Sequence, residues 1–158
     1  MLDSGGTGVN IPVFDETLRT GNETIDNQHR WLFTLAARVA KQIDACSEQS
    51  AEPTSSDEAC VGRTEDAVAE AIYGLVDYIT EHFTDEEDLM VASGYPSASV
   101  HKSLHEDLSR RVAGYTLRFM NEDEVAAREL VVFFDEWLRS HIMVADRALT
   151  TWLAERKR

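Results

Sequence analysis

The sequence predicts an all-α protein, an antiparallel up-down-up-down four-helix bundle with an N-terminal arm. Apolar residues recur at helical spacing in four stretches, at about residues 22–46, 63–92, 97–120 and 124–155. Glycine and proline, which disfavour helices, number only 8 and 3 and gather near the N-terminus and in two short breaks. We expect residues 1–158 to form a single domain, because this length is typical of one core.

The predicted elements follow one another along the chain. Residues 1–21 begin glycine-rich and then carry apolar side chains, which predicts an arm packed on the bundle. Asn22 is the expected N-cap of the first helix. The polar stretch 47–62 predicts a long loop before the second helix. Gly94 and Pro96 should end the second helix, and the polar step at 121–123 should end the third.

Composition excludes several classes of protein. The net charge is −14, and no basic cluster other than the tail at 156–158 could bind a polyanion, so nucleic acid is not an expected partner. No apolar run approaches the roughly 20 residues that span a bilayer, and no export signal is recognisable. We therefore expect a cytoplasmic protein with no membrane insertion. Cys46 and Cys60 flank the predicted loop and are either a redox-sensitive clasp or two separate thiols.

The histidines and two carboxylates form one pattern on the apolar stripes of the predicted helices. The candidate metal ligands are His29, His82, Glu86, His101, His105, His141 and Asp146. Burial of so many ionisable groups without compensation would be severely destabilising. A metal centre would supply that compensation, whereas a single histidine of this kind would more often be an ordinary core residue.

Spacing along the helices indicates how these residues would pair. His82 stands four residues before Glu86, and His101 four before His105. Such pairs lie about 40° apart around a helix and can chelate one ion. His141 stands five residues before Asp146, a step that rotates by about 140°. This pair should not converge on one ion unless the helix is locally distorted, and it could instead serve two neighbouring ions.

Coordination arithmetic favours a centre with two ions. Five nitrogens divide three and two, and two bridging carboxylates with one bridging oxygen add three bonds to each ion. The total of six and five leaves one octahedral position open, which suits dioxygen. Closed zinc sites have four ligands and usually cysteine, so structural zinc fits poorly. Imidazole and carboxylate suit iron, with manganese and cobalt as alternatives.

Several stretches resemble the hemerythrin family, specifically the bacterial hemerythrins. They are residues 25–29 (IDNQH), 82–90 (HFTDEEDLM), 101–105 and 137–142 (WLRSHI), with Asp146. The resemblance covers about residues 12–153 and implies a non-haem di-iron centre, oxo- or hydroxo-bridged, that binds dioxygen reversibly. It assigns His101, His105 and His141 to the coordinatively full iron, His29 and His82 to the iron with the open position, and Glu86 and Asp146 to both as bridges.

The resemblance also implies an oxygen pocket walled by Phe83, Trp137, Leu138 and Ile142, although ordinary core packing explains each of them equally well. Asp26 lies three residues before His29 and is expected either to orient that ring or to stabilise the first helical turn. One departure from the family is Phe14, which stands near a position where an arm tryptophan is common.

Three functions are consistent with these residues. The first is oxygen binding for transport, storage, delivery or sensing, as a monomer or weak oligomer with a protein partner if it senses. The second is a di-iron oxidase, peroxidase or nitric-oxide-handling enzyme. Such enzymes use paired Glu-x-x-His motifs, and no histidine here follows a glutamate at that spacing, so we expect at most weak side activity. The third is an iron or redox sensor, with the Cys46/Cys60 loop as its readout.

Overall fold

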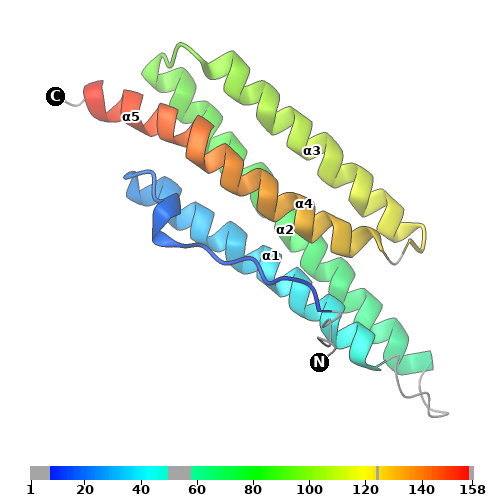
Figure 1. The fold of residues 1–158 in the computed structure, drawn as a ribbon. Coiled ribbons are helices and arrows are strands. Elements are labelled where there is room, and N and C mark those ends of the chain that lie inside the picture. The colour runs from blue at the N-terminus through cyan, green and yellow to red at the C-terminus, as the bar shows by residue number, and fades with distance from the viewer. Residues whose placement is uncertain (1–7, 50–57, 124, 157–158) are drawn as a thin grey trace, which may run out of the picture.

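The computed structural model describes residues 8–49, 58–123 and 125–156, which form long antiparallel helices (Figure 1). The elements are η1 (Glu16–Leu18), α1 (Glu23–Gln49), α2 (Glu58–Ser93), α3 (Ala98–Met120), α4 (Ala126–His141), η2 (Ile142–Asp146) and α5 (Arg147–Arg156). The last three form one continuous rod, because η2 is a turn of π-helix that joins α4 to α5. The all-α, up-down-up-down bundle is therefore confirmed.

The connection between the first two helices is shorter than the sequence predicts. The loop was expected at 47–62, but α1 continues to Gln49 and α2 already begins at Glu58. The flanking residues include glutamate, glutamine and alanine, which prolong a helix that has already formed even where no apolar stripe marks it. Residues 50–57 and the side chain of Cys60 lie outside the described part of the chain, as does the proposed clasp between Cys46 and Cys60.

A Schellman motif ends α2. Gly94 adopts a left-handed conformation with φ of 66°, which a residue without a Cβ tolerates easily. The Gly94 amide donates to the Val91 carbonyl at 3.2 Å, and the Tyr95 amide donates to the Met90 carbonyl at 2.9 Å. These two bonds satisfy carbonyl groups that the helix leaves open. The chain then turns into α3, so the histidines of α2 and α3 can face one another.

The N-terminal arm runs alongside α1 and is tied to the α4–α5 rod (Figure 1). Arg139 donates to the Val13 carbonyl at 2.7 Å and to Asp15 at 3.2 Å. Thr150 donates to the Thr20 carbonyl at 3.1 Å. Phe14 packs edge-on against the buried Phe33, with ring centroids 5.9 Å apart. The arm is thus part of the packed body in residues 8–22.

The core runs along the bundle axis and draws apolar side chains from all the long helices. Its fully buried members include Leu32, Val39, Ile72, Leu75, Leu108, Leu130, Phe134, Leu138 and Ile142. No helix among the described residues is long and apolar enough to cross a membrane.

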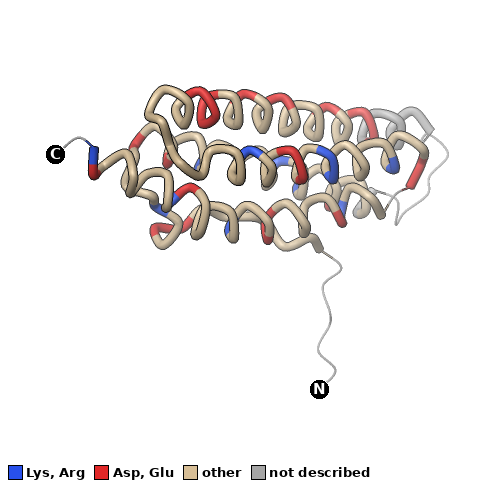
Figure 2. Tube along the Cα trace, turned by 90° about the horizontal axis from the view of Figure 1, so that it is seen from above, with Lys and Arg blue, Asp and Glu red and all other residues tan. Residues whose placement is uncertain are grey.

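Charge is spread unevenly over the outside of the bundle. Residues 65–93 of α2 contain nine acidic residues, of which only Glu86 is buried, and no lysine or arginine. Figure 2 shows the acidic positions repeating along this helix. Such a field raises the local concentration of cations around the bundle.

Candidate metal centre

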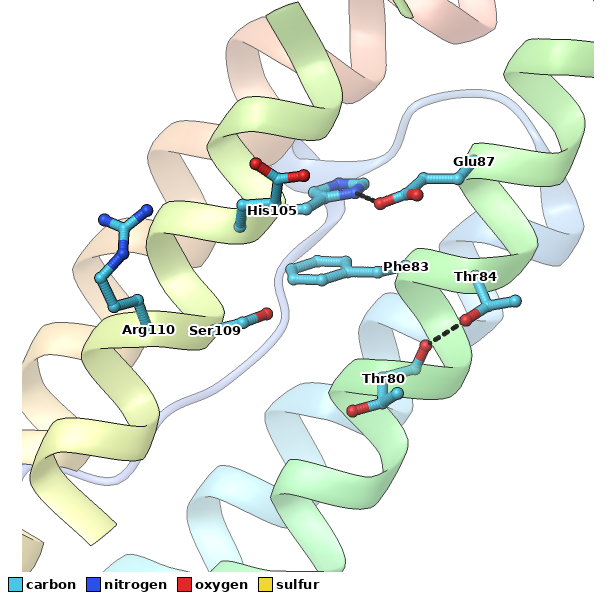
Figure 3. A pocket seen from close by; sticks show the side chains of 8 residues that line it. Thr80, Phe83, Thr84, Glu87, His105, Ser109 and Arg110 are labelled. Carbon is cyan, nitrogen blue, oxygen red and sulfur yellow. Dashed lines mark hydrogen bonds and ion pairs between the residues drawn. The ribbon is translucent and has the colours of Figure 1, made fainter. Parts of the chain in front are cut away.

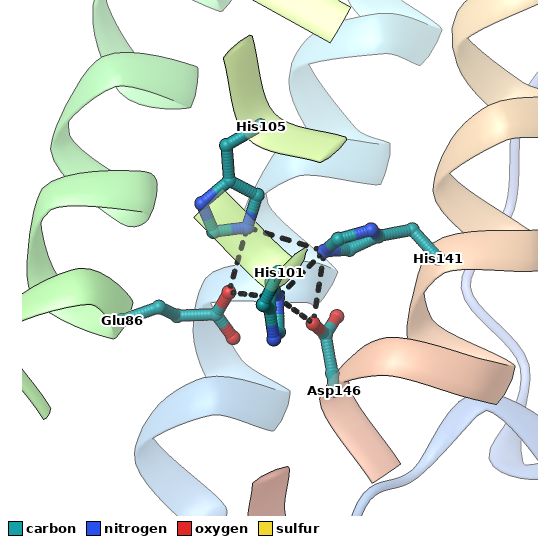
Figure 4. A group of neighbouring side chains, drawn as sticks. All are labelled: Glu86, His101, His105, His141 and Asp146. Atoms are coloured by element: carbon teal, nitrogen blue, oxygen red, sulfur yellow. Dashed lines mark hydrogen bonds and ion pairs between the residues drawn. The ribbon is translucent and has the colours of Figure 1, made fainter. Parts of the chain in front are cut away.

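The seven predicted ligands converge at one buried place between the helices. All are at most 5 % exposed. They form two groups, and within each group one ligand atom from every residue lies within 4.8 Å of the others. The three-histidine group consists of His101, His105, His141, Glu86 and Asp146 (Figure 4). The two-histidine group consists of His29, His82 and Glu86.

The three-histidine group has the spacing of a preformed coordination shell. The Nε2 atom of His141 lies 3.0 Å from that of His101 and 3.2 Å from that of His105. Glu86 Oε2 lies 3.5 Å and 3.3 Å from the same atoms of His101 and His105. Ligands at right angles around an octahedral ion with bonds of about 2.1 Å are roughly 3.0 Å apart. These contacts therefore match the edges of one octahedron.

Asp146 links the two groups through its separate oxygens. Its Oδ1 atom lies 3.1 Å from His101 Nε2 and 3.0 Å from His141 Nε2. Its Oδ2 atom lies 3.1 Å from His29 Nε2. Glu86 is shared as well, because its Oε2 atom also lies 3.9 Å from His82 Nε2. Both carboxylates thus contact histidines of both groups.

The π-helical turn explains how His141 and Asp146 meet despite their spacing of five. In this turn the Arg147 amide bonds to the carbonyl of Ile142, five residues earlier. A π-helical turn holds more residues than an α-helical one, so residues five apart come closer to the same face. The local distortion that a spacing of five requires is present, and it places Asp146 Oδ1 at 3.0 Å from His141 Nε2.

While the histidine rings carry no proton on the nitrogens that face the centre, many buried polar atoms of these residues lack hydrogen-bond partners. Unpartnered atoms are His29 Nδ1 and Nε2, His82 Nε2, both carboxylate oxygens of Glu86, His101 Nδ1 and both carboxylate oxygens of Asp146. An unsatisfied buried polar group costs about 1–3 kcal/mol. Cations held between these atoms would offset that cost, so the donor set fits a pair of metal ions. The three-histidine group and the two-histidine group could each hold one.

Partners on the outer ring nitrogens fix the tautomers of two histidines. His82 Nδ1 donates to Gln28 Oε1 at 3.1 Å, and His105 Nδ1 donates to Glu87 Oε1 at 3.3 Å. Both acceptors are oxygens that carry no proton, so the ring proton sits on Nδ1 and the Nε2 lone pair faces the centre. Gln28 and Glu87 are not among the predicted site residues. The sequence signal for them is that they lie within the stretches 25–29 and 82–90, next to His29 and Glu86.

Asp26 does not orient His29. Its carboxylate accepts hydrogen bonds from the Thr20 amide at 2.7 Å, the Thr20 hydroxyl at 2.8 Å and the Gly21 amide at 3.3 Å. Of the two alternatives for Asp26, the bond to His29 is absent, and Asp26 lies in the first turn of α1, where it fastens the end of the arm to the start of the helix. The donors to the Asp26 carboxylate lie in the arm just before α1, so the bonds pair backbone amides that no helix carbonyl accepts.

The electrostatics of the site favour a cation. Burial lowers the pKa of His82 to about 4, so this ring is neutral and its lone pair is available near pH 7. At His101, burial opposes the charged ring, but hydrogen bonds with Asp146 and Glu86 outweigh it and raise its pKa to about 9. Despite burial, bonds from His101 and His141 hold the pKa of Asp146 well below its usual range. Without metal, a proton on His101 neutralises part of the carboxylate charge.

Two of the four predicted oxygen-pocket residues, Phe83 and Trp137, stack on histidine rings. Phe83 stacks on His105 with centroids 3.7 Å apart and an interplanar angle of 5°, and Trp137 stacks on His141 at 4.3 Å and 15°. Phe83 also lies 5.7 Å from the ring of His82. The remaining two residues, Leu138 and Ile142, are buried in the core. The aromatic rings therefore shield the centre on its outer side.

A surface hollow of about 430 Å³ lies next to this shield between α2 and α3 (Figure 3). Its lining includes Thr80, Phe83, Thr84, Glu87, His105 and Ser109. Phe83 and His105 form part of both the hollow and the surroundings of the three-histidine group. A small molecule in the hollow would thus meet the face of the aromatic shield.

Comparison with known proteins gives a consistent result. Residues 20–153 match the family model described as the Hemerythrin HHE cation binding domain. The bacteriohemerythrin of Pseudomonas paraeruginosa is 35 % identical over 130 residues, which are 82 % of this chain and 73 % of the relative. That of Stenotrophomonas maltophilia is 35 % identical over 136 residues, 86 % and 77 % of the two chains. The myohemerythrin of Theromyzon tessulatum is 27 % identical over 133 residues, 84 % and 86 % of the two chains. With its bundle and its buried ligand set, this chain belongs to the hemerythrin family.

Proposed function

We propose that this protein holds two iron ions at the buried centre and through them binds dioxygen reversibly, for transport, storage, delivery or sensing. The observation that carries the proposal is the convergence of five imidazoles and two carboxylates, most with unpartnered buried atoms, at one place in a hemerythrin fold. Imidazole and carboxylate ligands suit iron, and the absence of cysteine from the set disfavours a structural zinc site.

In this proposal the ligands divide as the two groups do. His101, His105 and His141 would hold one iron, His29 and His82 would hold the other, and Glu86 and Asp146 would bridge them. The first iron then has three imidazoles and the second has two, which leaves the open position on the second. The separate contacts of the two Asp146 oxygens support the bridging role.

When bound, the two irons would supply the electrons that dioxygen takes up and would recover them on its release. The chain itself contributes shielding and orientation. Phe83, Leu138 and Ile142 are buried and would keep water from the centre, which would slow the displacement of reduced oxygen by water and the irreversible oxidation of iron that follows from it. The bonds from His82 and His105 to Gln28 and Glu87 hold those rings in the ligating orientation.

We propose a binding protein rather than an enzyme. Cleavage of an O–O bond is aided by a positioned proton donor. Among the described residues, those stacked on the ligand rings or buried beside them are mostly apolar, such as Phe83, Trp137 and Leu138. The ligand set is also rich in nitrogen, with five imidazoles to two carboxylates. Any oxidase or peroxidase turnover should therefore be slow.

Anaerobic loading with ferrous iron tests the proposal. The wild-type chain should take up two ions, develop a visible absorption band when oxygen is admitted, and lose that band when oxygen is removed. His82→Ala should bind one ion and lose the response, whereas the exposed neighbour Glu81→Gln should behave as wild type. Irreversible oxidation on first contact with oxygen, with accumulation of peroxide, would instead identify an oxidase. The cytoplasmic location stays a prediction that cell fractionation would check.

A further inference from the structure

We infer that Gln28 is a positioning residue that holds His82 and sets the metal affinity and reduction potential of the two-histidine group. This inference rests on the proposed function. It concerns a residue that contacts no metal itself and acts through the outer nitrogen of one ligand.

Gln28 joins a buried ligand to the surface by two hydrogen bonds. Its Oε1 atom accepts from His82 Nδ1 at 3.1 Å, and its Nε2 atom donates to Asp85 Oδ2 at 2.6 Å. The bond to Asp85 decides which way the amide points, because only the NH₂ group can donate to a carboxylate. The carbonyl oxygen is therefore left facing the imidazole. Since the His82 side chain is fully buried, Gln28 is its outer anchor.

The position of Gln28 also couples the two histidines of its group. Gln28 precedes His29 on α1, while His82 lies on α2. The rings of His29 and His82 pack edge to face, with centroids 5.0 Å apart. A bond from α1 to the outer edge of His82 thus helps to fix the orientation of the two rings relative to one another.

In the three-histidine group, the corresponding outer partner of a ligand ring is a carboxylate rather than a neutral amide. His105 Nδ1 bonds to the Glu87 carboxylate at 3.3 Å, and Lys102 lies 2.9 Å from the other oxygen of Glu87. A carboxylate acceptor makes an imidazole a more basic ligand than a neutral amide does, and basic ligands favour the more oxidised metal. The amide of Gln28 therefore keeps the ion of the two-histidine group easier to reduce than a carboxylate would. The chain distinguishes its two ions by their outer partners.

An exchange of the amide and the carboxylate tests this role with little change in shape. In the double variant Gln28→Glu/Asp85→Asn, the new carboxylate can accept from His82 and from the new amide, so both bonds and the net charge persist. Gln28→Met removes the bonds and keeps the length of the side chain. Asn27→Ala, at the exposed neighbouring position, is the control. Each variant is titrated anaerobically with ferrous iron against a competing chelator, and its midpoint potential is measured.

The expected results separate positioning from a merely structural role. Gln28→Met should bind one of the two ions roughly 10- to 100-fold more weakly. The double variant should bind both ions and show a midpoint potential below that of wild type, a shift that intact packing alone would not produce. Wild-type affinities and potentials in both variants would overturn the role of Gln28. A wild-type chain that binds no second ion would overturn the proposed function as well, so the two failures are distinguishable.

Discussion

Replacement of Asp146 by asparagine should weaken the binding of both metal ions at once. The two carboxylate oxygens face different groups, with Oδ1 at 3.0 Å from His141 and Oδ2 at 3.1 Å from His29. Asparagine keeps the shape but loses the charge and one of the two acceptor oxygens. Replacement of His105 by alanine, in contrast, should weaken only the binding of the ion in the three-histidine group.

The size of the effect follows from the number of ligands. A structural zinc ion with four ligands binds with an apparent free energy of about 10–16 kcal/mol, so one ligand contributes roughly 3 kcal/mol. Since 1.4 kcal/mol is a factor of ten, each ion should lose roughly a hundredfold in affinity. At an iron concentration near 100 times the wild-type Kd, each ion stabilises the wild type by about 2.7 kcal/mol and the variant by about 0.4 kcal/mol, so the free energy of unfolding falls by about 2.3 kcal/mol per ion.

Calorimetric or chelator-competition titration with ferrous iron under nitrogen measures both affinities, and thermal unfolding with and without iron measures the linked stability. A decrease of about 2–4 °C in Tm is expected for each kcal/mol in a chain of this size. Glu136→Gln, which removes an exposed carboxylate of the same rod, is the matched control. The bridging assignment is refuted if Asp146→Asn weakens a single ion and leaves the other at its wild-type affinity.

Three further predictions concern the proton on His101, the aromatic ring of Phe83 and the N-terminal arm. Because the pKa of His101 is raised to about 9, its stabilising charge is complete below pH 6.5 and is lost as the pH rises through 9, so Tm of the chelated protein should fall between pH 7 and 10. Phe83→Ala should cost up to about 3–5 kcal/mol in denaturant unfolding and speed oxidation of the iron-loaded protein, since it opens the hollow toward His105. Arg139→Ala should cost about 1–2 kcal/mol and expose the arm near Asp15 to limited proteolysis.

Each of these predictions has a control and a result that contradicts it. Asp146→Asn should flatten the alkaline fall in Tm, and a flat profile in the wild type would contradict the proton on His101. Val112→Ala truncates the core away from the centre, so it should lower stability without faster oxidation of iron. Arg111→Ala removes an arginine that does not contact the arm. An arm that resists protease equally in the Arg139 and Arg111 variants would show that other contacts hold it.

The amino-acid sequence alone is enough to predict the helical class and to single out the candidate ligand set. Helical periodicity depends on neighbours three and four residues apart, so the apolar stripes predict the helices before any tertiary contact is known. The pair His101 and His105, four residues apart, could be recognised for the same reason. The convergence of all seven residues was an inference from their shared polarity on apolar stripes, and the structure places them together.

Contacts between segments far apart in the sequence could not be predicted from local patterns and became visible only in the folded chain. The bond from His82 to Gln28 joins residues 54 positions apart, and no local pattern encodes which side chain will stand opposite a ring. The π-helical turn over Ile142–Asp146 brings His141 and Asp146 together, and no local residue pattern predicts where the regular helix is interrupted. Asp26 accepts hydrogen bonds from backbone amides of the arm and does not bond to His29. Local periodicity is a short-range property, whereas the partners of a buried polar atom are set by how the helices pack.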